Sequence, residues 1–151
     1  MIRFLIFLGL NFGALALGSL FTKAGVSSDW YQELNKAPWT PPGAVFGVAW
    51  TTIMICFTIY MSRLWRAMLY KQEVIILFAL QWILNVSWNP LFFGIQTPII
   101  ALVTIVLLTA LVFYIMNKYK EKVFSYSLLM LPYFIWLVIA TSLNTYVVLF
   151  N

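Results

Sequence analysis

Amide and tryptophan side chains recur on one face of a long apolar segment in the middle of the chain. Within "QWILNVSWNPLFF", residues 81–93, the spacing i, i+4, i+7 and i+11 places on one helical face Gln81, Asn85, Trp88 and Phe92. Buried amides are costly in lipid and usually turn toward a polar partner or a cavity. The stripe therefore predicts either an interhelical hydrogen-bond pair or the polar anchors of a binding site.

A second stripe of the same kind lies near the C-terminus, within "PYFIWLVIATSLN". The spacing i, i+3, i+7 and i+11 places on one face Tyr133, Trp136, Ala140 and Asn144. The small side chain of Ala140 leaves room for a flat ligand between aromatic walls. An aromatic stripe alone is more typical of packing. Together with Trp50, which follows a proline-rich segment, the two stripes predict an apolar pocket with a few polar anchors, the usual form of a small-molecule site.

The proline-rich segment "WYQELNKAPWTPPG", residues 30–43, separates two apolar segments. Its prolines are Pro38, Pro41 and Pro42. Prolines restrict their own backbone and hold the preceding residues extended, so we expect a stiff loop. Its aromatic residues, Tyr31 and Trp39 among them, suit either an interfacial belt at the membrane surface or a lid over a cavity. The stiffness favours the lid, because belt residues need no rigid frame.

The chain lacks the residues of conventional catalysis. It has no histidine, which removes the commonest metal ligand and general base, and its four acidic residues lie at predicted loops or helix ends. The single cysteine, Cys56, allows no intrachain disulfide. We expect no metal site, no required cofactor and no ordinary proton-coupled transport, which normally uses an intramembrane carboxylate or histidine. The reactive groups that remain are aromatic, seven Trp and eight Tyr, which can exchange electrons with a photoexcited ligand.

Composition places these residues in a membrane. Hydrophobic residues make up 64% of the 151 residues and charged residues only 9%, against about 25% charged in soluble domains. The uncharged stretch from Val74 to Asn117 is long enough for two spans, separated by a turn between Gly94 and Pro98. The prediction is an all-α integral membrane protein, a single bundle of five transmembrane helices near 3–22, 43–66, 73–94, 98–118 and 123–149, with an ordered lid-like loop at 23–42.

Three local features qualify this plan. The first apolar segment, with Arg3 and "ALA" at 14–16, also resembles a secretory signal peptide, but its length suits a span, so we interpret it as the first helix. Pro90 should kink the third helix near its end. Small residues four apart permit either a dimer contact or close packing within the chain. That spacing occurs at Gly9 with Gly13 and at Gly43 with Gly47.

Basic residues mark the two sides of the membrane. Seven lie at the N-terminus and in the second and fourth loops: Arg3, Arg63, Arg66, Lys71, Lys118, Lys120 and Lys122. The opposite side has Lys23 and Lys36. The positive-inside rule predicts a cytoplasmic N-terminus, with the first loop and the C-terminus outside, in the cell membrane of a bacterium. The basic residues form no stripe, so nucleic acid is not an expected partner.

In these segments the sequence resembles the TspO/MBR family of tryptophan-rich sensory proteins, which includes the mitochondrial translocator protein (peripheral benzodiazepine receptor). The matching pieces are "WYQELNKAPWTPPG" followed by Trp50, "LNVSWNPLFFG" at 84–94 and "PYFIWLVIATSLN" at 132–144. The resemblance implies a five-helix bundle in membrane lipid, commonly a homodimer, that binds porphyrins such as protoporphyrin IX. It further implies that the pocket below the first loop is lined by Tyr31, Pro41, Trp50, Asn85, Trp136 and Ala140.

Residues and resemblance together predict a membrane receptor or sensor for porphyrins and other flat lipophilic ligands, with a role in tetrapyrrole regulation or stress response. The predicted ligand-binding residues are Tyr31, Trp39, Pro41, Trp50, Gln81, Asn85, Trp88, Tyr133, Trp136, Ala140 and Asn144. The alternatives are a transporter of such molecules and a light-dependent porphyrin-degrading enzyme, in which Trp50 and Trp136 would be the photochemical partners. No basic residue follows Tyr146, which argues against the family's proposed sterol motif.

Overall fold

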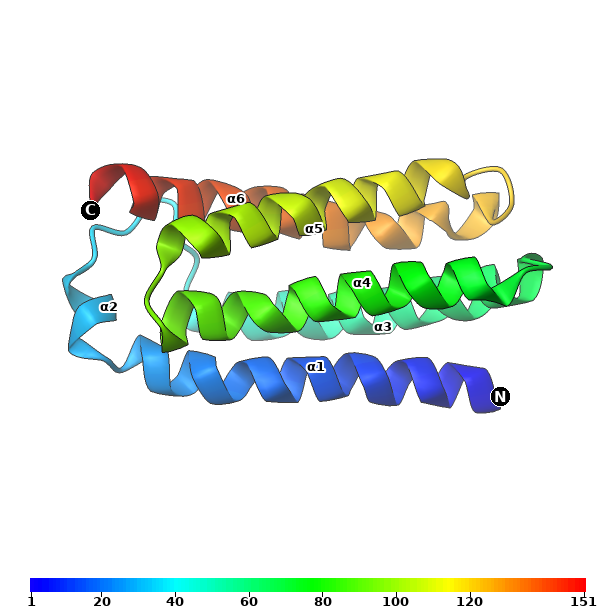
Figure 1. The fold of residues 1–151 in the computed structure, drawn as a ribbon, viewed down its shortest axis with the longest axis horizontal. Coiled ribbons are helices and arrows are strands. Elements are labelled where there is room, and N and C mark those ends of the chain that lie inside the picture. The colour runs from blue at the N-terminus through cyan, green and yellow to red at the C-terminus, as the bar shows by residue number, and fades with distance from the viewer.

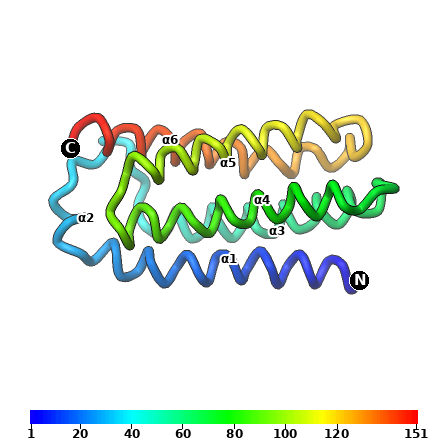
Figure 2. The backbone as a smooth tube through the Cα atoms, in the orientation of Figure 1, coloured from blue at the N-terminus to red at the C-terminus, as the bar shows by residue number.

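The computed structural model describes residues 1–151, which form helices joined by turns and one longer loop. In chain order the elements are α1 (Ile2–Val26), α2 (Asp29–Glu33), α3 (Gly43–Ala67), α4 (Lys71–Asn89), the π-helical turn η1 (Pro90–Gly94), α5 (Pro98–Lys118), the 3-10 helix η2 (Phe124–Met130) and α6 (Leu131–Phe150). The long helices run side by side along the bundle (Figure 1). The two termini lie at opposite ends, as an odd number of crossings requires (Figure 2).

Five helical units are long and apolar enough to cross a membrane. They cover Ile2–Val26, Gly43–Ala67, Lys71–Gly94, Pro98–Lys118 and Phe124–Phe150. α1 continues past the expected end near residue 22, so Lys23 and Gly25 belong to the helix rather than to the loop. The fifth unit begins as the 3-10 helix η2 and becomes α-helical only at Leu131, where Pro132 occupies the first turn, a position in which its missing N–H costs nothing.

Pro90 changes the helix type of the third span. α4 ends at Asn89, and Pro90 opens the single π-helical turn η1. Proline offers no N–H to the helical ladder, and the wider turn is closed by the N–H of Ile95, which donates to the carbonyl of Pro90 at 2.9 Å. Gln96 then adopts a φ of 53°, and the chain reverses into α5.

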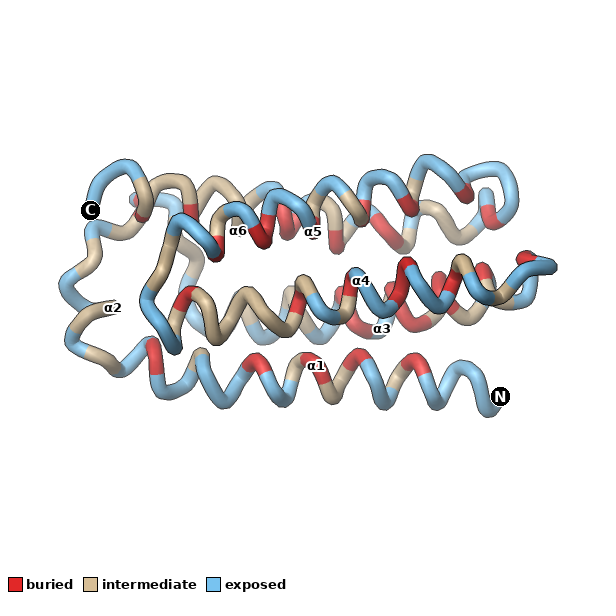
Figure 3. The backbone as a smooth tube through the Cα atoms, viewed as in Figure 1, coloured by how far each residue is buried: buried red, intermediate tan, exposed pale blue.

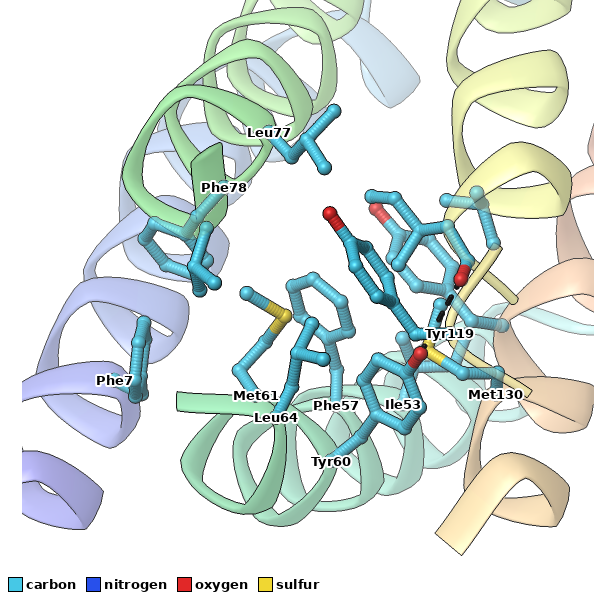
Figure 4. Close-up of a cluster of buried hydrophobic side chains, with 14 of the residues drawn as sticks. Phe7, Ile53, Phe57, Tyr60, Met61, Leu64, Leu77, Phe78, Tyr119 and Met130 are labelled. Carbon is cyan, nitrogen blue, oxygen red and sulfur yellow. Dashed lines mark hydrogen bonds between the residues drawn. The ribbon is translucent and has the colours of Figure 1, made fainter. Parts of the chain in front are cut away.

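The apolar core fills the half of the bundle nearest the N-terminus. Most of its residues come from the first halves of α1, α4 and α6 and from the middle and last turns of α3 and α5, and the turns at Met68 and Tyr119 add others. Phe57 and Phe78 stack with ring centroids 6.0 Å apart, and Phe7 packs edge-on against Phe78 at 5.0 Å (Figure 4). Buried positions face inward (Figure 3), while large apolar side chains such as Ile100 and Leu107 of α5 remain exposed, as lipid-facing residues do.

The first loop crosses the other end of the bundle. Ser28 caps the short helix α2 by accepting a hydrogen bond from the N–H of Tyr31 at 3.3 Å. The chain then passes in extended form to the end of α6 before it enters α3 (Figure 1). There the N–H of Asn35 donates to Oδ1 of Asn151 at 2.8 Å, and Nδ2 of Asn35 donates to the carbonyl of Phe150 at 3.0 Å. The loop is therefore fastened to an element that is remote in sequence.

Candidate ligand-binding cavity

A cavity of about 570 Å³ lies beneath the first loop, in the half of the bundle that the apolar core leaves open. Its walls come from α1, α3, α4 and η1, and the loop supplies the roof. The lining residues are Ala14, Leu15, Gly18, Ser19, Thr22, Lys23, Val26, Tyr31, Thr40, Pro41, Gly43, Phe46, Gly47, Trp50, Thr51, Met54, Asn85, Trp88, Asn89 and Phe93. Its size and mostly apolar lining with a few polar groups are those of small-molecule sites.

Aromatic rings form the wall on the α4 side. The ring of Tyr31 lies 5.5 Å from that of Phe93, and Phe93 packs perpendicular to Trp88 at 5.9 Å. Phe93 belongs to the π-helical turn η1 and Tyr31 to α2, so this contact joins the two elements. Trp50 lines the α3 side and packs edge-on against Tyr133 at 6.1 Å. Aromatic side chains therefore line the cavity on both the α3 and the α4 sides.

Asn85 is a buried amide of the cavity whose side chain has no hydrogen-bond partner within the chain. Its side chain is only 8% exposed, yet it makes no hydrogen bond to any other residue. Asn89, one turn further along α4, does have a partner, because its Oδ1 accepts from the hydroxyl of Thr22 at 2.7 Å. A buried amide is expensive to leave unpaired, so Asn85 offers a donor and an acceptor to a molecule in the cavity.

A single charged side chain lines the cavity, that of Lys23 on the last part of α1. Lys23 is exposed and forms no ion pair, since the one salt bridge of the protein joins Lys118 to Glu73 at the other end. Nearby, burial raises the pKa of the Tyr31 phenol above its usual value, so this side chain stays neutral at physiological pH. The solvent-exposed edge of the cavity at Lys23, which we call its mouth, is thus cationic, and no carboxylate lines the cavity.

The loop is held over the cavity by contacts to α6. Thr40 and Pro41 line the cavity, whereas Trp39 is not among its lining residues and is 54% exposed. The indole N–H of Trp39 donates to the hydroxyl of Ser142 at 3.1 Å, and its ring packs edge-on against Tyr146 at 5.5 Å. Trp39 therefore lies outside the cavity and fastens the loop that roofs it.

Several predicted site residues lie behind the cavity walls. Trp136 packs edge-on against Phe46, a lining residue, with centroids 5.1 Å apart, but Trp136 does not itself line the cavity. The same is true of Ala140 on the same helix. The wall that the sequence analysis expected from the fifth span is formed in this cavity by α1, because the aromatic residues of α3 fill the space toward α6.

Hydrogen bonds account for the other residues behind the walls. Nε2 of Gln81 donates to the hydroxyl of Tyr133 at 2.6 Å, deep in the bundle. Asn144 accepts from the indole N–H of Trp88 at 3.1 Å and donates to the carbonyl of Pro98 at 2.9 Å. Asn144 thus joins three helical segments and fixes the orientation of Trp88, which does line the cavity.

The contribution of α1 to the cavity was not predicted from the sequence. None of the predicted site residues lies on this helix, although Ala14, Gly18 and Thr22 recur every four residues on the face toward the cavity. Gly18 lies so close to the Asn89 side chain that an added Cβ would be 2.6 Å from its Nδ2. This run of small side chains was the available signal, and it marks where α4 approaches α1.

These features define an all-α integral membrane protein, with five membrane-length helices around an apolar cavity roofed by a loop. The chain belongs to the TspO/MBR family, which it matches over residues 5–149. The resemblance noted in the tryptophan-containing segments and the predicted fold class are therefore confirmed.

Individual relatives align over most of their length. The chain is 35% identical to the tryptophan-rich protein TspO of Chlorobaculum tepidum, over 84% of this chain and 82% of that protein. It is 36% identical to the tryptophan-rich protein TspO of Archaeoglobus fulgidus, over 89% of this chain and 87% of that protein. It is 30% identical to the tryptophan-rich sensory protein of Cereibacter sphaeroides, over 77% of this chain and 73% of that protein.

Proposed function

We propose that the protein is a membrane receptor or sensor that binds porphyrins, protoporphyrin IX among them, in the cavity below the first loop. Binding there would couple tetrapyrrole supply to regulation or to a stress response. The observation that carries the proposal is Asn85, a buried amide without a partner in the chain, in a cavity that aromatic rings line on the α3 and α4 sides. Such a site supplies ring faces for a flat molecule and one directional polar contact.

The position of Lys23 favours a ligand that carries carboxylate groups, such as a porphyrin carboxylic acid. The ring system would lie between Trp50, Trp88 and Phe93, and the propionates would point toward the open mouth, where Lys23 has no other counter-charge. A cation there adds a charge-assisted hydrogen bond to a ligand carboxylate and nothing to an ester. The site is therefore expected to prefer amphipathic anions to neutral lipophiles of the same shape.

Titration with protoporphyrin IX and its dimethyl ester, followed by tryptophan fluorescence, tests this assignment. Asn85→Ala should weaken binding of both ligands about fivefold, the value of one hydrogen bond. Lys23→Gln should weaken binding of the free acid about fivefold and leave binding of the ester unchanged. Asn117→Ala, which removes an amide from the other end of the bundle, serves as the control and should change neither titration.

Two outcomes would contradict the proposal. If the unmodified protein shows no saturable quenching with either ligand, the cavity is not a porphyrin site. If Lys23→Gln weakens binding of the acid and of the ester equally, Lys23 shapes the mouth but does not pair with a carboxylate.

We further propose that the membrane is a bacterial cell membrane and that the loop end of the bundle faces outward. The support is the charge distribution: seven basic residues lie at the end opposite the loop, and Lys23 and Lys36 lie at the loop end.

A further inference from the structure

A second cavity lies at the end of the bundle opposite the first loop. It has a volume of about 370 Å³ and lies between the last turns of α3 and the start of η2. Its lining residues are Arg63, Arg66, Ala67, Lys122, Val123, Phe124, Ser125 and Tyr126. We name this cavity the basic cleft, because its charged residues are all cationic.

The cations of the basic cleft have no carboxylate partner. The guanidinium of Arg63 lies 4.8 Å from the ring centroid of Tyr126, and Nζ of Lys122 contacts the sulfur of Met68 at 3.5 Å. Glu121 is the neighbouring acidic residue in sequence and forms no ion pair with them. Arg66 lies in the last turn of α3, where a cation compensates the helix dipole, but Arg63 is further inside the helix and Lys122 lies outside any helix. Dipole compensation therefore explains only Arg66.

Apolar side chains border the basic cleft. On η2, Phe124 lines the cleft and is 70% exposed, and Leu128, four residues further along the same helix, is 72% exposed. Exposed apolar residues next to a cationic hollow match an amphipathic molecule, with its charge in the cleft and its chains along η2. A free phosphate ion would use the cations and leave this apolar border without a role.

We propose that the basic cleft binds the phosphate group of an anionic phospholipid from the membrane leaflet at this end of the bundle. Arg63 and Arg66 supply planar guanidinium groups that pair with phosphate oxygens, and Lys122 adds a point charge. The hydroxyl of Ser125 adds a neutral donor. Basic pockets at the ends of membrane helices are known to suit such headgroups. The proposal does not depend on the ligand of the main cavity.

Native mass spectrometry of the detergent-purified protein with phosphatidylglycerol or phosphatidylcholine tests the proposal. The unmodified protein should retain phosphatidylglycerol in preference to phosphatidylcholine. The double variant Arg63→Gln/Lys122→Gln should bind phosphatidylglycerol about tenfold more weakly, because each surface cation contributes measurably to anionic lipid binding. The matched control Arg3→Gln/Lys120→Gln removes the same charge from the same end without touching the cleft, and should bind as the unmodified protein does.

A second variant tests the site without removing a cation. Ser125→Glu places a carboxylate among the cleft cations, and it should reduce phosphatidylglycerol binding while the fold is retained, since Ser125 is exposed. Equal loss in both double variants would show a general charge effect and overturn the proposal. Displacement of the lipid by millimolar inorganic phosphate would overturn the assignment to a phospholipid and indicate a soluble phosphate ligand.

Discussion

At the scale of single residues, Gly25 is the position where side-chain size should matter most. A Cβ added there would lie 2.3 Å from Cδ1 and 2.5 Å from Cβ of Phe93, so the α1–η1 contact would have to move. We expect Gly25→Ala to destabilise the protein by about 1–3 kcal/mol, as overpacking does. Gly9→Ala is the control, because nothing lies within 4 Å of its added Cβ, and helix propensity favours alanine by up to about 1 kcal/mol. Thermal unfolding in detergent should separate the two variants, and equal midpoints would contradict the predicted close packing.

Individual residues of the cavity differ in how far their positions could be predicted from the sequence. Helical spacing placed Asn85 and Trp88 on one face, and both line the cavity, because register within a single helix follows from the period of 3.6 residues. It could not show that Trp136 lies behind Phe46, since that depends on how α3 is rotated relative to α6. Helical spacing also could not identify Lys23 as a lining residue. The charge of Lys23 suggested that the first helix ends near residue 22, but α1 continues for one more turn, to Val26.

At the scale of elements, the first loop should act as a lid whose closure depends on Trp39. Trp39→Ala removes both the hydrogen bond to Ser142 and the edge-on contact with Tyr146, each worth about 1 kcal/mol. Amide hydrogen exchange of residues 34–42 should become faster and protoporphyrin IX should dissociate about tenfold faster, while the five-helix bundle stays folded. Tyr70→Ala, an exposed aromatic residue at the other end, is the control. If Trp39→Ala instead lowers the unfolding temperature and leaves dissociation unchanged, the loop is scaffolding.

The elements themselves were largely evident from the sequence. Spans in lipid must satisfy their own backbone hydrogen bonds, so uncharged stretches of sufficient length become helices almost independently of their packing. The departures occur at special backbone positions. Pro90 gives a π-helical turn rather than a simple kink, and the segment after Val123 forms a 3-10 helix, because local hydrogen bonding there depends on neighbours that periodicity does not describe.

At the scale of the whole molecule, the two ends of the bundle differ in charge, and this difference should set its orientation in the membrane. The test replaces one exposed acidic residue at each end, Glu33→Cys and Glu121→Cys, in a Cys56→Ala background. Acidic residues contribute little to orientation, so both variants keep the full set of topogenic lysines and arginines. A membrane-impermeant maleimide should label Glu33→Cys in intact bacterial cells and Glu121→Cys only after lysis. The reverse pattern would turn the cationic mouth toward the cytoplasm and the basic cleft toward the outer leaflet, so the porphyrin and the phospholipid would each be drawn from the other side of the membrane.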